Sequence, residues 1–129
     1  MRAFDRGQWE AQIRRVFGKT ADAIIAIEDK VHKNDPARHA RRLDNIIDHW
    51  DEIVAIIDRE LADGRDLKAR MERLGLPMRP SDIGISNADA LDAFICSRDI
   101  RDRYLSTSLL WDIGWMDEIA AWLPSVCNE

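Results

Sequence analysis

Glycine is sparse in this sequence of 129 residues, and its six copies are scattered. The closest pair, Gly75 and Gly84, is separated by nine positions. A loop that cradles a phosphate needs several glycines within about six positions, because a Cβ atom there would occupy the space of the anion. The sequence therefore excludes the glycine-rich nucleotide motifs, and we expect no dinucleotide to bind this chain in the usual way.

Histidine is also scarce. His32, His39 and His49 do not form the H-x-x-x-H or H-E-x-x-H pairs that bring two imidazoles to one face of a helix. A site built from His49 with Asp48 or Asp51 and a distant carboxylate is the alternative. We favour histidines that lie on helix surfaces or cap a neighbouring helix, and we predict no metal ligand in this chain.

The candidates for a nucleophile are few. Of the two cysteines, Cys96 and Cys127, the first follows Phe94 and Ile95, a context in which a thiol usually packs as a small buried hydrophobe. Nothing around either cysteine indicates oxidation. Ser86 lacks the second glycine of a nucleophile elbow and is expected to cap a helix. We predict no catalytic residue.

Long apolar runs are missing as well. The longest, Ala23–Ile27 and Ile53–Ile57, are far shorter than a bilayer requires. The segment Met1–Arg6 returns to charge before an apolar region can form, which predicts no secretory signal. We expect a protein without a membrane span and with a cytoplasmic location.

Positive charge is in deficit, with 19 basic residues against 24 acidic ones and a net charge of -5. The one basic cluster comprises Arg38, His39, Arg41 and Arg42, and acidic residues follow it. We interpret this cluster as a solvated helix face and expect no nucleic-acid partner.

What the sequence does contain is helical periodicity, with apolar residues that recur every three or four positions. No segment alternates as a strand does, and only four valines are present. We predict a single domain over residues 1–129, an all-α compact bundle of five or six helices. The expected helices cover Gln8–Val31, Pro36 to a stop at Gly64, Asp66–Leu74 with Gly75 as its cap, the Ser86 cap to about Tyr104, about Leu105 to Gly114, and Trp115–Leu123.

Five tryptophans account for most of the aromatic content. Trp9, Trp50, Trp111, Trp115 and Trp122 lie on or beside the apolar stripes of the expected helices. Core filling is the favoured interpretation, and the alternative is that some of them anchor an interface with another domain or subunit.

Two stretches resemble a known family. The segment Leu74–Ile85 is similar to the L-G-x-P-x-x-P-x-x-I-G-I loop of the glycerol-1-phosphate dehydrogenases, relatives of dehydroquinate synthase and of the iron-containing alcohol dehydrogenases. Ile100–Tyr104 and Leu109–Gly114 are similar to that family's C-terminal I-R-D-R-Y-T-x-L-D-L-x-x-D-L-G segment, at matching spacing. The resemblance extends over about His49 to Gly114.

The sequence departs from that pattern at two positions. Leu105 stands where the family has threonine, and Ser108 stands where it has aspartate. We therefore expect the local helix cap to come from Ser106 or Thr107.

The resemblance implies a two-domain enzyme that exchanges a hydride between dihydroxyacetone phosphate and glycerol 1-phosphate. Its cofactors are NAD(P) and a divalent metal, held by a nucleotide-binding α/β domain and by an aspartate and two histidines at the start of a helical domain. This chain corresponds to the part after those histidines. No cofactor-binding residue and no metal ligand carries over to it.

Arg101 and Arg103 are the remaining substrate-side candidates, because a guanidinium suits a phosphate. On a helix these two side chains diverge by about 200°, so at most one of them faces a given site. Pairing with Asp99 or Asp102 is the structural alternative, and it is the one we favour.

The leading hypothesis is that the chain is the C-terminal helical portion of a glycerol-1-phosphate dehydrogenase-like oxidoreductase and is inactive in isolation. The alternative is a stand-alone, non-enzymatic helical module. Such a module would form a homo-oligomer or bind a protein partner through an apolar helix face. A self-sufficient small enzyme is not expected.

Overall fold

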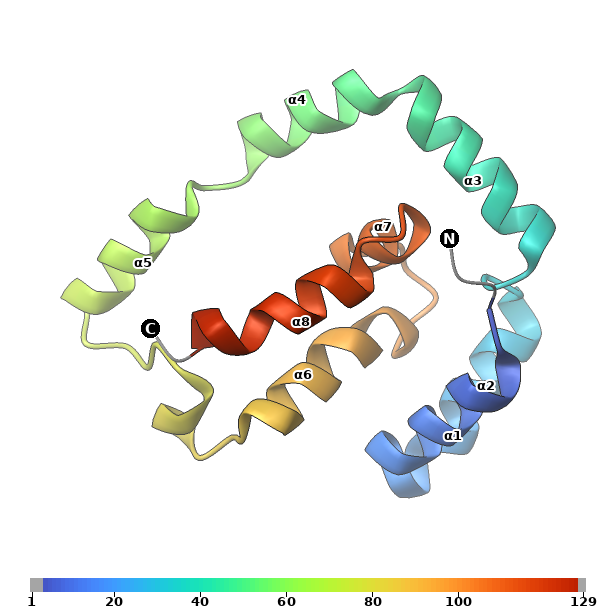
Figure 1. Ribbon diagram of the computed structural model, residues 1–129, viewed down its shortest axis with the longest axis horizontal. Coiled ribbons are helices and arrows are strands. Elements are labelled where there is room, and N and C mark those ends of the chain that lie inside the picture. Colours follow the sequence, from blue (N-terminus) through green and yellow to red (C-terminus); the bar gives the residue numbers. More distant parts are fainter. Residues whose placement is uncertain (1–3, 128–129) are drawn as a thin grey trace.

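The computed structural model describes residues 4–127, and the regular secondary structure of this range is entirely helical (Figure 1). The prediction of an all-α bundle is confirmed. The α-helices of the described range are α1 (Arg6–Phe17), α2 (Ala21–Val31), α3 (Pro36–Asp48), α4 (Trp50–Glu60), α5 (Gly64–Arg73), α6 (Asn87–Cys96), α7 (Ser106–Asp112) and α8 (Met116–Cys127). Short 3-10 helices are η1 (Gly18–Thr20), η2 (Pro80–Ile83) and η3 (Ser97–Asp99).

The apolar core lies where α1, α2 and α6 meet. Its buried members are Trp9, Ile13, Ala21, Ile24, Ile25 and Cys96. Ile13 is fully buried, and an isoleucine side chain in such a place contributes about 2 kcal/mol through the hydrophobic effect. Helices α6 and α8 lie side by side, and Met116 and Ala120 of α8 are buried as well (Figure 1).

The predicted single helix over Gln8–Val31 is divided in two, so that prediction was wrong. Gly18 adopts φ 50° and ψ -117°, a backbone conformation that side chains with a Cβ rarely accept. Its N–H donates to the carbonyl of Arg14 and ends α1. The η1 turn that follows lets α2 fold back and pack on α1.

The predicted helix from Pro36 to Gly64 is also divided. His49 separates α3 from α4, and α4 ends at Glu60. Gly64 begins α5 and does not end the preceding helix, because Asp63 caps α5 by accepting from the N–H groups of Arg65 and Asp66. These two divisions account for the eight α-helices of residues 4–127, where the apolar pattern indicated five or six helices.

The helix expected to reach Tyr104 stops at Cys96 instead. Ser97 Oγ donates to the carbonyl of Phe94 at 2.8 Å, and the chain then continues as η3 and a bend. At the other end of the chain, α8 runs through Pro124 to Cys127 and does not end before the proline. Proline has no N–H to donate, so one backbone hydrogen bond of the helix is missing at this position.

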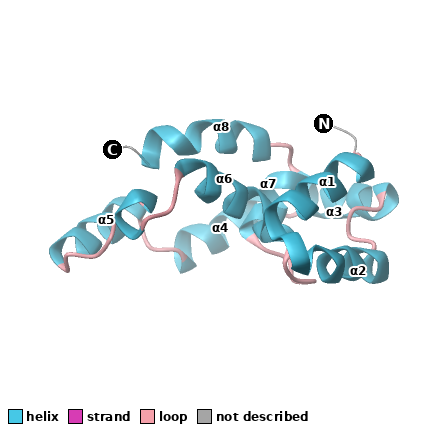
Figure 2. Ribbon diagram, turned by 90° about the horizontal axis from the view of Figure 1, so that it is seen from below, coloured by secondary structure: helices cyan, strands magenta, loops and turns pink. Residues whose placement is uncertain are grey.

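Helices α3, α4 and α5 form an arc around one side of the molecule (Figure 1). Seen from the edge, α8 lies along one face, α2 lies along the other, and α5 extends at one end (Figure 2). We call α4 and α5 together the arm. Within residues 50–73, all of which the structure describes, no side chain is buried. No helix of the described range combines the length and the apolarity needed to cross a bilayer.

Candidate functional site

Charged and polar side chains fill the interior between α2, α3, η3 and α7. Burying a charge is costly unless partners compensate it, so each of these groups is expected to have a hydrogen-bond or ion-pair partner. The buried polar residues of this region are Glu28, Asn34, His39, Arg98, Asp99, Thr107 and Asp112.

Asp112 is the centre of one half of this network, with a side chain only 1% exposed. Arg42 donates from Nε and Nη2 to its two carboxylate oxygens, both at 2.9 Å. The Tyr104 hydroxyl donates to Asp112 Oδ2 at 2.8 Å. His39 Nε2 lies 3.1 Å from the backbone carbonyl of Asp112. Three side chains from two other segments therefore hold this one residue.

These contacts shift two titrations. The hydrogen bonds from Arg42 to Asp112 raise the pKa of the guanidinium above its usual value. Burial, and then the hydrogen bond to Asp112, raise the pKa of the Tyr104 hydroxyl well above its ordinary value. Arg42 stays charged and Tyr104 stays neutral throughout the physiological range.

Arg98 is the centre of the other half of the network. Its Nη2 donates to Asn34 Oδ1, and its guanidinium carbon lies 4.1 Å from the centre of the Trp111 ring. Lys33 Nζ donates to the Arg98 carbonyl at 2.6 Å and lies 3.0 Å from Asp99 Oδ1. Burial lowers the pKa of the Arg98 guanidinium, and the carboxylate of Asp99 opposes that effect.

This half of the network is incompletely satisfied. Glu28 Oε1 accepts from the Asn34 N–H at 3.0 Å, but Glu28 Oε2 has no hydrogen-bond partner among the described residues. The same is true of Asn34 Nδ2 and Arg98 Nε. Buried polar atoms without partners are uncommon in folded proteins, and they are concentrated here around Arg98.

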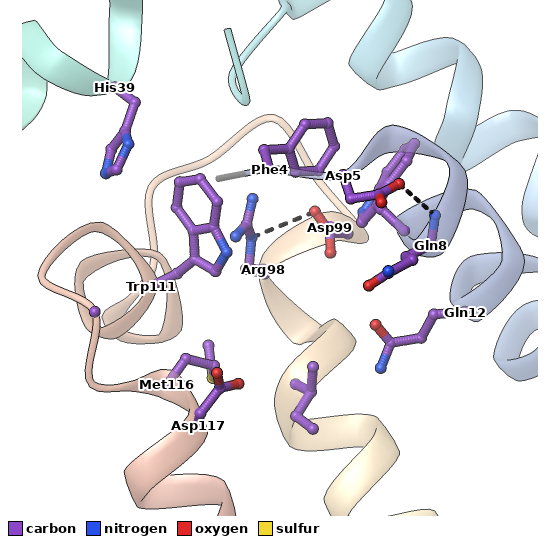
Figure 3. A pocket seen from close by; sticks show the side chains of 13 residues that line it. Phe4, Asp5, Gln8, Gln12, His39, Arg98, Asp99, Trp111, Met116 and Asp117 are labelled. Atoms are coloured by element: carbon purple, nitrogen blue, oxygen red, sulfur yellow. Dashed lines mark hydrogen bonds and ion pairs between the residues drawn. The ribbon is translucent and has the colours of Figure 1, made fainter. Parts of the chain in front are cut away.

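An aromatic pocket of about 240 Å³ adjoins Arg98 (Figure 3). Phe4, Trp9 and Trp111 supply its aromatic surface. In Figure 3, Arg98 lies between Trp111 and Asp99. Gln8 and Gln12 project from α1 on the side of the pocket opposite Trp111. Among residues 4–127, no three His, Cys, Asp or Glu side chains converge into a group that would hold a metal ion.

A second pocket, of about 210 Å³, shares Arg98 and Trp111 with the first. We call it the basic pocket, because cationic side chains dominate its lining. It is lined by Val31, Lys33, Arg38, Arg42, Arg98, Asp102, Arg103, Tyr104, Ser108, Trp111 and Asp112. The positive charges come from α3, η3 and the loops next to α2 and α7.

The structure separates the two substrate-side candidates. Arg103 lines the basic pocket, whereas Arg101 does not line it. Both are exposed and lie on the bend between η3 and α7, so the helical geometry expected for them was wrong. The expected pairing of Arg101 with Asp99 or Asp102 is not found in the described part of the chain, because Asp99 pairs with Lys33 and Arg98.

The expected cap of α7 is also corrected. Ser106 and Thr107 do not cap this helix; Ser108 Oγ instead accepts from the backbone N–H of Leu105 at 3.2 Å. Thr107 is buried, and its Oγ1 lies 2.9 Å from Ser97 Oγ. The hydroxyl of Thr107 therefore joins α7 to η3.

Sequence reasoning missed most of this network. It treated Arg38–Arg42 as a solvated face, whereas His39 is buried and Arg42 is paired with Asp112. One signal was present. Asp112 is the single charged residue in the apolar run Leu109–Ile113. A carboxylate on the apolar face of a helix becomes buried when the helix packs, and it then needs a cation as its partner.

Cys96 and His49 complete the set of sequence candidates. Cys96 is 1% exposed, and burial raises the pKa of its thiol to about 11, so the thiolate that a nucleophile requires is suppressed. The side chain of Cys127 lies outside the described part of the chain. His49 is exposed, and its Nδ1 lies 3.0 Å from the Asn45 carbonyl.

Comparisons with known proteins identify no relative: no protein-family model, no curated protein and no solved structure matches this chain. The family resemblance of its two segments stays a prediction.

Proposed function

We propose that this chain is a non-catalytic helical portion of a glycerol-1-phosphate dehydrogenase-like oxidoreductase. In this proposal the arm packs against the part of the enzyme that binds NAD(P) and the divalent metal. The single observation that carries the proposal is the uncovered apolar surface of the arm. Its exposed members, together with the end of α3 and the residue after α5, are Ile47, Trp50, Ile56, Ile57, Leu61, Leu67 and Leu74.

The arm has the sequence of a packed element but lacks a partner within the described chain. Ile57 and Leu61 are 38% and 64% exposed, although both belong to an apolar pattern of helical spacing. Helices of this length are marginal in water unless tertiary packing covers an apolar face. Large exposed apolar patches mark interaction sites, so the arm is best explained as one side of an interface.

The strongest part of the family resemblance lies directly after the arm. Leu74–Ile85 leaves α5 through Gly75, which has φ 64° and ends the helix as predicted. Asp82 then organises the loop, because its Oδ2 accepts from the N–H groups of Met78 and Arg79 at 2.9 and 3.0 Å. These bonds lower the pKa of the Asp82 carboxyl. The loop is thus a defined structure at the end of the arm.

The residues of this chain do not fit the cofactors themselves. The described residues offer no converging metal ligands, and the sequence has no glycine-rich loop for a nucleotide. The metal would polarise the substrate carbonyl and the nicotinamide would carry the hydride, both held by the remainder of the enzyme. The contribution of this chain is to form one wall of the enzyme and to hold the arm in place.

The test starts from the native gene product, tagged at its C-terminus in its own organism. We expect the tagged polypeptide to be recovered in a particle that contains a nucleotide-binding domain, on the same chain or on a second one. That particle should reduce dihydroxyacetone phosphate with NAD(P)H and a divalent metal. The purified 129-residue chain should show no turnover.

Variants of the arm make the test specific. Ile57→Asp and Leu61→Asp should remove activity from the particle, because they place a charge in the proposed interface. Asp58→Asn is the matched control, an exposed polar residue on the same helix, and it should leave activity unchanged. Recovery of the tagged chain free of any nucleotide-binding domain and without turnover contradicts the proposal.

A second candidate, a self-associating helical module, is favoured by one further observation. An apolar groove of about 440 Å³ lies between α3 with the start of α4 and the turn from α7 to α8. It is lined by Leu43, Ile46, Ile47, Trp50, Ile113 and Trp115. The arm of a second copy has the apolar character to fill such a groove. Sedimentation would then show a dimer of the purified chain, and Ile47→Asp would convert it to a monomer.

A further inference from the structure

We propose that the basic pocket binds a phosphate dianion, either free or as the terminal group of a small phosphomonoester. Five cationic side chains line this pocket, against the two carboxylates of Asp102 and Asp112. This concentration of positive charge occurs in a protein whose net charge is -5. A local field opposite in sign to that of the whole molecule is a feature of anion-binding sites.

Two of the five cations have no carboxylate partner. Arg42 is neutralised by Asp112, and Lys33 and Arg98 both lie next to Asp99. Arg38, by contrast, donates to the backbone carbonyl of Val31, and Arg103 makes no hydrogen bond or ion pair with the described residues. Two guanidinium groups of the described chain therefore line one pocket without forming an ion pair. Guanidinium groups bind phosphate oxygens in a bidentate manner.

Arg98 adds a buried positive charge to the wall of the same pocket. It is 6% exposed, and its Nε has no hydrogen-bond partner among the described residues. Attraction between charges is stronger in such an environment than in water, because the effective dielectric constant is lower. An anion in the basic pocket would offset the cost of burying this guanidinium.

A neutral donor is present as well. Ser108 Oγ accepts from the Leu105 N–H, which leaves its own O–H free to donate into the pocket that it lines. The Tyr104 hydroxyl is directed to Asp112 and does not compete. The volume of about 210 Å³ is below the usual range for drug-sized ligands, so the pocket suits a small oxyanion and not a whole nucleotide.

This site is complete within the chain and does not rest on the proposed oxidoreductase role. All of its lining residues belong to α2, α3, η3, α7 and the adjoining loops, and none belongs to the arm. The purified chain should therefore bind phosphate even if no nucleotide-binding domain is ever found with it. A failure to find a nucleotide-binding domain would therefore not contradict phosphate binding, and a failure to bind phosphate would not contradict the oxidoreductase role.

The test is a titration of the purified 129-residue chain with inorganic phosphate and, separately, with methyl phosphate, at constant ionic strength in sodium chloride. Calorimetry gives the affinity, and backbone amide spectra locate the site. We expect saturable binding with shifts at Tyr104 and Ser108. Arg103→Ala and Arg38→Ala should each weaken the affinity about tenfold, as expected for the loss of a charge-assisted hydrogen bond.

Arg101→Ala is the matched control. Arg101 is exposed, lies two residues from Arg103 on the same bend and does not line the pocket. Its removal changes the net charge equally, so it should leave the affinity unchanged. Tighter binding of methyl phosphate supports a phosphomonoester as the ligand, and binding of inorganic phosphate alone supports the free ion. Equal affinities in wild type and in Arg103→Ala, or the same spectral shifts with chloride alone, overturn the proposal.

Discussion

Arg42 and Asp112 lie 70 residues apart in the sequence and form a two-pronged ion pair in the interior. Each of the two guanidinium nitrogens lies 2.9 Å from a different oxygen of the carboxylate. The pair joins α3 to α7. Because α3 leads directly into α4, this pair also fixes the base of the arm against the rest of the fold.

Removal of the carboxylate charge should destabilise the protein. Asp112→Asn keeps the size of the side chain but leaves Arg42 without its counter-ion. Breaking one partner of a buried pair costs about 3 kcal/mol. Urea denaturation should show that loss, whereas Asp44→Asn, an exposed acid on the same helix as Arg42, should change the free energy of unfolding by less than about 0.5 kcal/mol. Equal losses in the two variants would show that the ion pair contributes nothing.

The cap of α6 offers a test of a local prediction. Ser86 Oγ accepts from the backbone N–H of Asp89 at 3.1 Å, as its sequence position indicated. Ser86→Ala should therefore lower the free energy of unfolding by about 1 kcal/mol. Ser81→Ala, an exposed serine of η2 outside such a cap, is the control and should be close to neutral in the same thermal or urea unfolding experiment.

Caps of this kind were predictable because they depend on neighbours within one helical turn. The stop at Gly75 was predicted for the same reason, as was the start of α3 at Pro36, where Asp35 Oδ1 accepts from the Arg38 N–H. The all-α class followed from the period of the apolar residues. Local chemistry and periodicity therefore predicted which segments are helical, although not where two of the expected helices divide.

The polar network was not predictable in the same way. Arg98 meets Asn34 across 64 positions, and such a contact depends on how helices pack and not on any repeating pattern. Gly18 was visible in the sequence, but the apolar stripe continues on both sides of it, and a glycine inside a helix is tolerated. Only the fold shows that Gly18 takes a positive φ. Arg103 was separated from Arg101 only once the bend after η3 was known.

Stability should fall at alkaline pH through Cys96. In the unfolded chain its thiol titrates near 9.0, whereas burial raises the pKa in the folded protein to about 11. Below pH 9.0 the thiol is protonated in both states, and its contribution to stability is complete. As the pH rises from 9.0 to about 11, the unfolded chain releases a proton that the folded chain keeps. The free energy of unfolding should therefore drop by about 2 kcal/mol.

Comparison with Cys96→Ala isolates this effect. The Tyr104 hydroxyl also has a raised pKa and weakens the protein over the same alkaline range, but it does so equally in both proteins. Urea denaturation at about pH 8 and about pH 10.5 should show a steeper loss in wild type than in the variant. Parallel losses would show that the Cys96 thiol titrates normally in the folded state.

The arm should open without unfolding the core. Its helices bury no side chain, whereas Ile13, Ala21 and Cys96 are at most 1% exposed in the core formed by α1, α2 and α6. Local opening is least costly where few apolar contacts are lost, so amides of residues 50–73 should exchange with solvent at least about 100-fold faster than those of α1 and α2.

Hydrogen exchange followed by mass spectrometry measures this difference peptide by peptide. In the purified chain, Ile57→Asp should leave the exchange of α1 and α2 unchanged, because the arm is independent of the core. In the larger oxidoreductase particle, the arm should become protected, because a partner then covers its apolar side chains. Arm amides as slow as those of the core in a chain that sediments as a monomer would mean that the arm is stable uncovered, and the argument for an interface there would lose its basis.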